Sequence, residues 1–172
     1  MTKLSGCLTV LCAAGLLHAE TTAGLRWTAP AAWKAQAERP MRAATYSIPA
    51  ATGDKEDGEC AVYYFGPSQG GSVEANLKRW IGQFEQPEHE AQTRKRTING
   101  LNVTTIDLSG TYTGAGGPMA TGKTSKSGFR LLGAIVEAPE GLVFFKFTAP
   151  AKTVAAHQAN FEELLKSLAV QR

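Results

Sequence analysis

Cysteine is rare in this chain, which has three cysteines in 172 residues. Cys7 and Cys12 lie in an N-terminal apolar segment that we expect to be removed, which leaves Cys60 alone. A single cysteine cannot form an intramolecular disulfide, so packing has to stabilise the fold even in an oxidising compartment. Cys60 begins an apolar run, where a thiol is typically an inert, small hydrophobic group and not a nucleophile.

The chain also has no strong excess of positive or negative charge. Charged residues make up 19% of the chain and the net charge is +3, which excludes the strongly basic composition typical of nucleic-acid-binding proteins. After the leader, the chain lacks the ~20 consecutive apolar residues that a membrane span requires. The remaining length is close to that of one domain, so we expect a single globular domain over residues 20–172 with no membrane span.

The first nineteen residues predict a secretory signal peptide. Lys3 provides the positive end, residues 4–17 are uncharged and mostly apolar, and Ala19 is a small residue at the expected cleavage point. The sequence before Cys7 resembles a lipoprotein box, but most of the apolar stretch follows that cysteine, so we reject lipidation there. The sequence therefore predicts a periplasmic or secreted protein.

The rest of the chain alternates strand and helix signals. Cys60–Phe65 is apolar on both alternating faces, which is typical of a central strand. Ser72 is a suitable N-cap for a helix ending near Gln86, and Asn99-Gly100 predicts a tight hairpin turn. The expected elements are strands at 25–30, 41–48, 60–65, 129–136 and 142–147, a hairpin centred on 98–101, and helices at 72–86 and 154–168.

This order predicts an α+β fold. We expect a mainly antiparallel sheet of about six or seven strands with helices on both faces, a helix-sheet-helix sandwich, because strands that are apolar on both sides need covering layers. The glycine-rich residues 110–128 are expected to form a loop and no regular element.

Two motifs match catalytic patterns. Residues 117–124 (GPMATGKT) fit the phosphate-binding loop, but they do not lie between a strand and a helix, so we expect no nucleotide and no other cofactor. Gly66–Gly70 (GPSQG) fits the serine nucleophile elbow between a strand and a helix. Ser68, Asp107 and His157 then follow in the order of a Ser-Asp-His triad, which leaves a small serine hydrolase as the alternative function.

The spacing of acidic and histidine residues does not predict a metal site. The turn that contains Asp54, Glu56, Asp57 and Glu59 lacks the ligand spacing of a calcium loop, and His157 lies far from the other histidines. The basic run Arg94-Lys95-Arg96 lies near an expected hairpin strand, where charge commonly deters edge-to-edge aggregation.

The long loop at 110–128 is the expected place for binding, because long loops in compact domains often contact ligands. Its candidate contact residues are Tyr112, Met119, Lys123 and Lys126, and flexibility alone explains the same composition.

Several segments resemble an uncharacterised group of exported bacterial proteins: residues 42–49 (RAATYSIP), Tyr64-Phe65-Gly66, Gly70-Gly71, Arg79-Trp80 and residues 128–135 (GFRLLGAI). The element order also resembles the PsbP-like fold. The resemblance implies a noncatalytic binding or accessory module with an unknown protein or small-molecule partner. A purely structural component of the envelope is a third hypothesis, which predicts no pocket and one self-complementary apolar patch.

Overall fold

The computed structural model describes residues 19–85, 91–114 and 125–171. Within these ranges the chain forms, in order, β1 (Ala19–Thr22), β2 (Leu25–Thr28), β3 (Lys34–Ala35), β4 (Arg42–Ile48), β5 (Gly58–Tyr64), α1 (Val73–Ile81), β6 (Phe84–Glu85), β7 (Gln92–Ile98), β8 (Leu101–Tyr112), β9 (Lys126–Ala138), β10 (Gly141–Pro150), α2 (Ala151–Lys166) and β11 (Ala169–Val170).

Most strands belong to one eight-stranded sheet. Its order is β3-β4-β5-β10-β9-β8-β6, with β7 pairing β8 beside β6, and every one of these pairs is antiparallel. A second sheet of three strands has the order β1-β2-β11. The predicted antiparallel α+β class is confirmed and β5 is a central strand, but the expected count of six or seven strands is too low. The missed strands β1, β3, β6 and β11 have two to four residues, too few for a periodic pattern.

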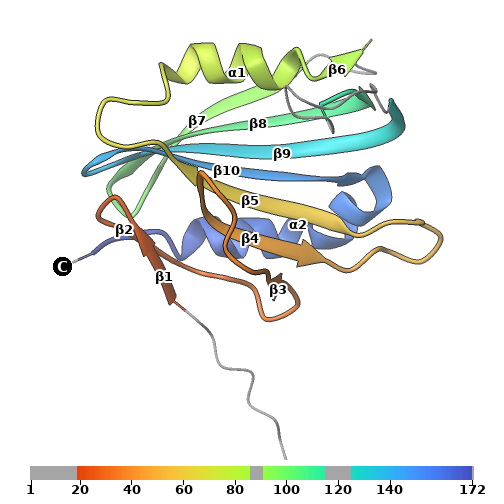
Figure 1. Cartoon of the computed structure of the whole chain (residues 1–172), viewed down its shortest axis with the longest axis horizontal. Coiled ribbons are helices and arrows are strands. Elements are labelled where there is room, and N and C mark those ends of the chain that lie inside the picture. The colour runs from red at the N-terminus through yellow and green to blue at the C-terminus, as the bar shows by residue number, and fades with distance from the viewer. Residues whose placement is uncertain (1–18, 86–90, 115–124, 172) are drawn as a thin grey trace, which may run out of the picture.

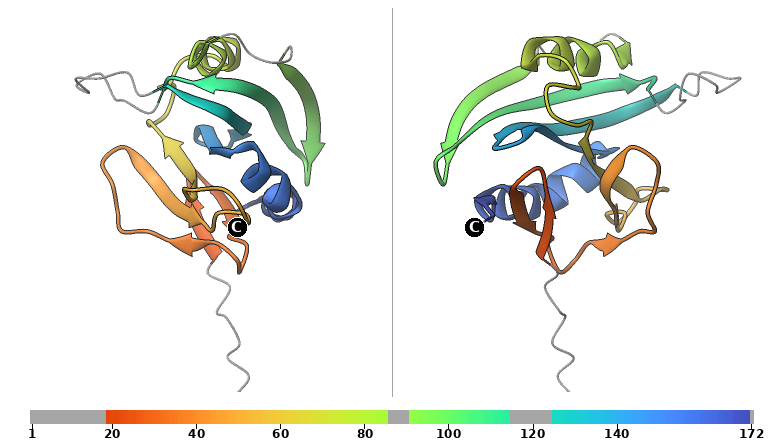
Figure 2. Two further views of the ribbon diagram at one scale, coloured as in Figure 1. Left: turned by 90° about the vertical axis from the view of Figure 1, so that its right-hand side faces the viewer. Right: turned by 60° about the vertical axis from the view of Figure 1, so that its left-hand side comes forward.

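The two helices lie on opposite faces of the large sheet (Figures 1 and 2). Neighbouring residues of β10 show the division, because Phe144 belongs to the hydrophobic cluster beneath α1 and Phe145 to the one beneath α2. Leu25 and Trp27 of the small sheet also belong to the α2-side cluster. The arrangement is the helix-sheet-helix sandwich that the two-sided strands predict.

Both helices begin at a side-chain cap. The Ser72 hydroxyl accepts a hydrogen bond from the amide of Ala75 at 3.2 Å, as the sequence predicts. The start of α2 is capped from a distant loop, because the Asp54 carboxylate accepts bonds from the amide and the hydroxyl of Thr153 at 2.9 and 2.6 Å. α1 ends at Ile81, earlier than predicted, because Phe84 already pairs with β8.

The predicted hairpin at 98–101 is confirmed. Asn99 and Gly100 have φ angles of 49° and 82°, as a two-residue type I′ turn requires. The expectation that residues 110–128 form no element is partly wrong, because β8 continues to Tyr112 and β9 begins at Lys126. A register shift lies between Gly110 and Tyr112, so the glycine there permits a bulge and does not end the strand.

None of the helices in the described ranges is long and apolar enough to cross a membrane. Residues 1–18 of the signal peptide predicted over 1–19 lie outside those ranges, and Ala19 is the first residue of β1.

Candidate functional site

Ser68, the nucleophile of the hydrolase hypothesis, is exposed in the loop between β5 and α1. Its φ angle is +58°, and the tight turn around it is closed by a bond from the Gln69 amide to the Gly66 carbonyl. This loop follows the C-terminal end of β5 and lies near the β9–β10 turn, since a Cβ on Gly141 would come within 3.5 Å of the Gly66 carbonyl oxygen. Ser68 therefore lies at one end of the sheet.

His157 lies at the other end. Its Nε2 is 3.2 Å from the carbonyl oxygen of Pro49 and its Nδ1 is 3.2 Å from Oδ1 of Asn160. Pro49 follows Ile48, which pairs with Gly58 at the start of β5, so the strand separates His157 from the Ser68 loop by about 20 Å. His157 is also on α2, while the Ser68 loop leads into α1 on the opposite face.

Asp107 contacts neither residue. Its two carboxylate oxygens accept bonds from Nε and Nη2 of Arg130 at 2.8 and 2.6 Å, and the same Nη2 donates to Gln158 at 3.0 Å. The bond to Asp107 raises the pKa of the Arg130 guanidinium above its ordinary value. The three proposed catalytic residues are thus not brought together, and the arrangement gives a serine hydrolase no support. In the helix predicted over 154–168, the helical spacing places Gln158 on one buried stripe with Val154 and Phe161, but Gln158 is exposed.

The acidic turn before β5 consists of carboxylates with separate partners. Asp54 caps α2, Asp57 accepts bonds from Ser47 and the Ala50 amide, and Glu56 pairs with Lys126. Over the described ranges, no group of three or more acidic, histidine or cysteine side chains is placed to hold a metal ion. Burial raises the pKa of the Cys60 thiol, as expected for an unreactive core cysteine.

Only two of the four loop candidates for binding lie in described segments. Met119, Lys123 and the whole GPMATGKT motif lie outside them, and the described chain resumes at Ser125, directly after the motif. Lys126 pairs with Glu56 and lies 5.2 Å from the ring centre of Phe129. Tyr112 is buried and stacks on Phe129, with ring centres 6.0 Å apart.

The Tyr112 hydroxyl belongs to a polar cluster around Lys146 of β10. Nζ of Lys146 donates to Gln83 Oε1 at 2.5 Å and to the Tyr112 hydroxyl at 3.0 Å, and the described residues give it no salt bridge. Burial lowers the pKa of Lys146 to about 8, and burial raises the pKa of Tyr112 to about 12. Sequence reasoning missed Lys146, because it stands alone in an apolar strand.

The α1 side of the sheet also has a groove beside the edge strand. The nine-residue helix α1 is much shorter than the twelve-residue strand β8, because a helix rises less per residue than a strand does. The helix therefore leaves the β7–β8 end of this face uncovered (Figure 1). The space has a volume of about 340 Å³. We call it the β7 groove, and it is lined by Val73, Glu74, Lys95, Arg96, Thr97, Asn102, Val103, Thr104 and Glu137.

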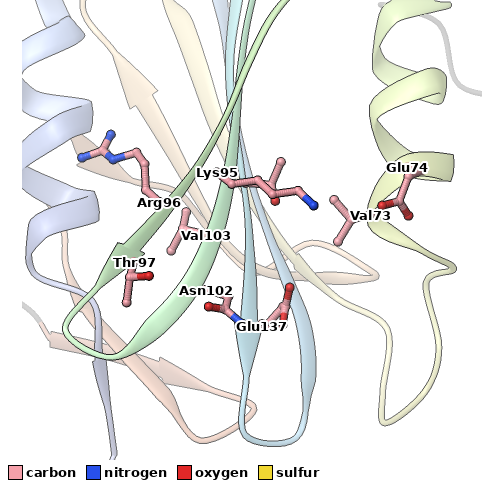
Figure 3. Close-up of a pocket in the computed structure, with 9 residues that line it drawn as sticks. Val73, Glu74, Lys95, Arg96, Thr97, Asn102, Val103 and Glu137 are labelled. Atoms are coloured by element: carbon pink, nitrogen blue, oxygen red, sulfur yellow. Dashed lines mark hydrogen bonds between the residues drawn. The ribbon is translucent and has the colours of Figure 1, made fainter.

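The walls of the β7 groove are polar. Figure 3 shows Lys95 extending from β7 toward Val73 and Glu74 at the start of α1. The pKa of the Glu74 carboxyl is lowered by a hydrogen bond from its own backbone amide, by the Ser72 hydroxyl and by the charge of Lys95. Across the floor, Asn102 donates to Glu137 at 3.1 Å. Amides, hydroxyls and charges of both signs therefore line a space that could bind polar groups.

A second, smaller cavity lies on the other face of β7. It has a volume of about 190 Å³ and is bordered by Arg94 and Arg96 of β7 and by Gln158 and Glu162 of α2. Arg96 Nη1 forms an ion pair with Glu162 at 2.9 Å. The run Arg94–Arg96, interpreted from sequence as protection against aggregation, was the available signal for this region.

These features define the class of protein as an α+β sandwich. It has one hydrophobic core on each face of the large sheet and a short helix over one of these faces. No family model and no curated protein matches the sequence. Among solved structures, the fold is similar to that of the PsbP protein from the cyanobacterium Synechocystis sp. PCC 6803, with a TM-score of 0.56 and 11% identity over 97% of this chain and 98% of that one. The PsbP-like fold expected from the resemblance is confirmed.

A second similar structure is a protein of unknown function from Pseudomonas aeruginosa, with a TM-score of 0.48 and 14% identity. It covers 89% of this chain and 96% of that one. At such identities the likeness concerns the fold.

Proposed function

We propose that this chain is an exported, noncatalytic binding or accessory module that contacts its partner through the β7 groove. The observation that carries the proposal is the short α1, which leaves about 340 Å³ beside the sheet edge open and lined by polar side chains. Side chains that filled this space would stabilise the fold more than an open groove does. An open polar groove next to a basic strand therefore favours a role in recognition.

The absence of a coherent triad supports a binding role over hydrolysis. His157 and Asp107 are engaged with other residues, and the strand length separates His157 from the Ser68 loop. The structural-component hypothesis has less support, because the exposed large hydrophobic residues of the described chain are Met41 and Val170, at 71% and 45% exposure. They border different sheets and offer no shared apolar patch.

The leader supports export. Residues 4–17 form the apolar core of a signal peptide, and the first strand begins at Ala19, so cleavage there leaves the sheets almost complete. Expression of the full chain in a Gram-negative host, followed by intact-mass measurement of the periplasmic fraction, should give a protein that begins near Glu20. An uncleaved cytoplasmic product would contradict export.

Site-specific photocrosslinking tests the binding surface. A p-benzoylphenylalanine at exposed Thr97 should give crosslinked species in intact cells, whereas the same group at exposed Ala155 on α2 should not. Asn102→Trp, which fills the groove, should reduce the Thr97 crosslinks at least about tenfold, equivalent to ~1.4 kcal/mol of binding. Equal crosslinking from Thr97 and Ala155, or no effect of the groove-filling variant, would contradict the assignment.

A further inference from the structure

The strand β7 has one edge that no other described strand covers. It pairs with β8 from Gln92↔Asp107 to Ile98↔Leu101, and no second pairing partner occurs in the described ranges. Figure 2 shows the β7–β8 hairpin curving out from the body of the sandwich. An uncovered edge presents backbone donors and acceptors that another strand can use.

The hairpin geometry determines which backbone groups face outward. In a two-residue type I′ hairpin, Ile98 and Leu101 exchange both of their backbone hydrogen bonds, and this bonding alternates along the ladder. Arg96 and Arg94 therefore bond to β8. The amide and carbonyl groups of Thr93, Lys95 and Thr97 point away from β8, toward the free edge.

Basic side chains flank this edge on both faces of the sheet. Arg94 and Arg96 border the cavity on the α2 side, and Lys95 reaches into the β7 groove on the α1 side. Arg96 is paired with Glu162, while neither Arg94 nor Lys95 forms a salt bridge with the described residues. The side chains of β7 itself would therefore present positive charge to both faces of an added strand, next to the carboxylates of Glu74 and Glu137 in the β7 groove and of Glu162 in the second cavity.

The charges also select between occupants. A second copy of β7 would place three basic residues against three basic residues, which opposes self-pairing of the sheet. An acidic strand would meet opposite charges at the same positions. The cavities on the two faces leave room for its alternating side chains.

We propose that the free edge of β7 binds an extended, acidic segment of a partner protein as an added strand of the sheet. This inference rests on the proposed binding function and names the chemistry of the partner. Backbone hydrogen bonds to Thr93, Lys95 and Thr97 would supply affinity, and Arg94 and Lys95 would supply selectivity for acidic residues.

A designed peptide tests strand addition directly. The probe is a fluorescent eight-residue peptide with three consecutive glutamates flanked by threonine and valine, and binding to the mature protein is followed by anisotropy. An otherwise identical probe with N-methyl groups on alternate residues cannot donate along one edge. We expect saturable binding of the first probe and at least about tenfold weaker binding of the methylated one, because each lost hydrogen bond contributes ~1 kcal/mol.

Matched variants locate the binding edge. Thr93→Pro removes one outward-facing amide while retaining the ladder to β8, and Thr93→Ala changes the same side chain but keeps the amide. We expect Thr93→Pro to weaken probe binding at least about fivefold and Thr93→Ala to leave it unchanged, with thermal unfolding confirming that both fold. The double variant Arg94→Glu/Lys95→Glu should weaken binding at least about tenfold.

Each contrary result overturns the inference. The inference is overturned if the unmethylated probe does not bind at concentrations up to about 1 mM, or if the two probes bind equally well. If Thr97 crosslinks persist unchanged in Thr93→Pro cells, the binding module stands and strand addition is wrong. If the probe binds as expected but groove positions never crosslink, the proposed function is wrong while the edge chemistry stands.

Discussion

The two faces of the large sheet differ in how completely they are covered. On one face, the 16-residue α2 and the three-stranded sheet pack on a continuous apolar surface that includes Phe145, Phe147 and Trp27. On the other face, the nine-residue α1 covers a smaller cluster centred on Trp80 and Phe144. The β7 groove and the Lys146 cluster lie on this second face.

This difference separates stability from recognition. The polar contacts of the α2 side, such as Asp107 with Arg130, join strands or attach the helix, and the smaller cavity beside Arg94 and Arg96 lies on the same side. The α1 side has the β7 groove at one margin and the Lys146 cluster at the other. A short helix on a wide sheet thus leaves surface for binding without removing the core.

The largest expected effect compares two neighbouring residues of β10. Phe145→Ala on the α2 side should reduce the free energy of unfolding by about 4 kcal/mol, and Phe144→Ala on the α1 side by about 3 kcal/mol. The cavity left by Phe145 lies under a long helix and a second sheet, which cannot collapse into it, whereas the loop at Gly70 beside Phe144 can adjust. Urea unfolding of both variants measures the difference, and a larger loss for Phe144→Ala would reverse the comparison.

The next effect tests the close packing of α1. A methyl group on Gly133 of β9 would overlap the Trp80 ring and come within 2.8 Å of Ile106. We expect Gly133→Ala to reduce the free energy of unfolding by about 2 kcal/mol through overpacking. In Gly133→Ala/Trp80→Phe the smaller ring relieves part of the overlap, so the double variant should lose less than the sum of its single variants. Strict additivity in denaturant unfolding would contradict this contact.

The pH dependence of stability tests the Lys146 cluster. The pKa of Lys146 is lowered to about 8 in the folded protein, so the unfolded state binds more protons between about pH 8 and 10 and stability should rise across that window. At neutral pH the buried charge is unfavourable, and Lys146→Met should raise the free energy of unfolding by about 2 kcal/mol after its lost hydrogen bonds are counted.

Thermal or urea unfolding between pH 7 and 9.5 measures this effect. The Lys146→Met variant should lose the rise in stability, and Lys152→Met, at an exposed position on α2, is the matched control that should keep it. The same pH profile in the Lys146→Met variant and the natural chain would show that another group titrates.

The smallest expected effect on stability comes from the edge of β7. Lys95→Glu should change the free energy of unfolding by less than about 0.5 kcal/mol, because the side chain is exposed and forms no described salt bridge. The same substitution should nevertheless weaken binding of the acidic probe. A stability loss comparable to that of Gly133→Ala would mean that Lys95 supports the fold, and the separation between the two faces would weaken.

Sequence reasoning succeeded where the signal is local. Ser72 predicted the start of α1, Asn99-Gly100 predicted the β7–β8 turn, and the apolar run from Cys60 predicted a central strand. It failed at Gln158, because helical spacing does not report that Arg130 lies opposite this residue. It also failed at the glycines near residue 110, because a glycine can permit a bulge within a strand instead of ending it. Export remains a prediction from the leader.

The candidate site was only partly accessible to such reasoning. The basic run at 94–96 marks an exposed strand, but a charged edge has the same sequence pattern whether it repels copies or binds a partner. The Ser68, Asp107 and His157 pattern had the correct order, yet chain order does not fix distance. Strand register places His157 and the Ser68 loop at opposite ends of β5.

By itself, the sequence determined the longer strands and both helices, their order and the two-sided apolar character of the central strands, because these depend on residues within a few positions of one another. Only the tertiary structure decided that α1 stops short of the sheet edge, that Arg130 takes the carboxylate of Asp107, and that Lys146 is buried beside Tyr112. Those outcomes depend on strand register and on which distant segments share a face, and no local pattern encodes either.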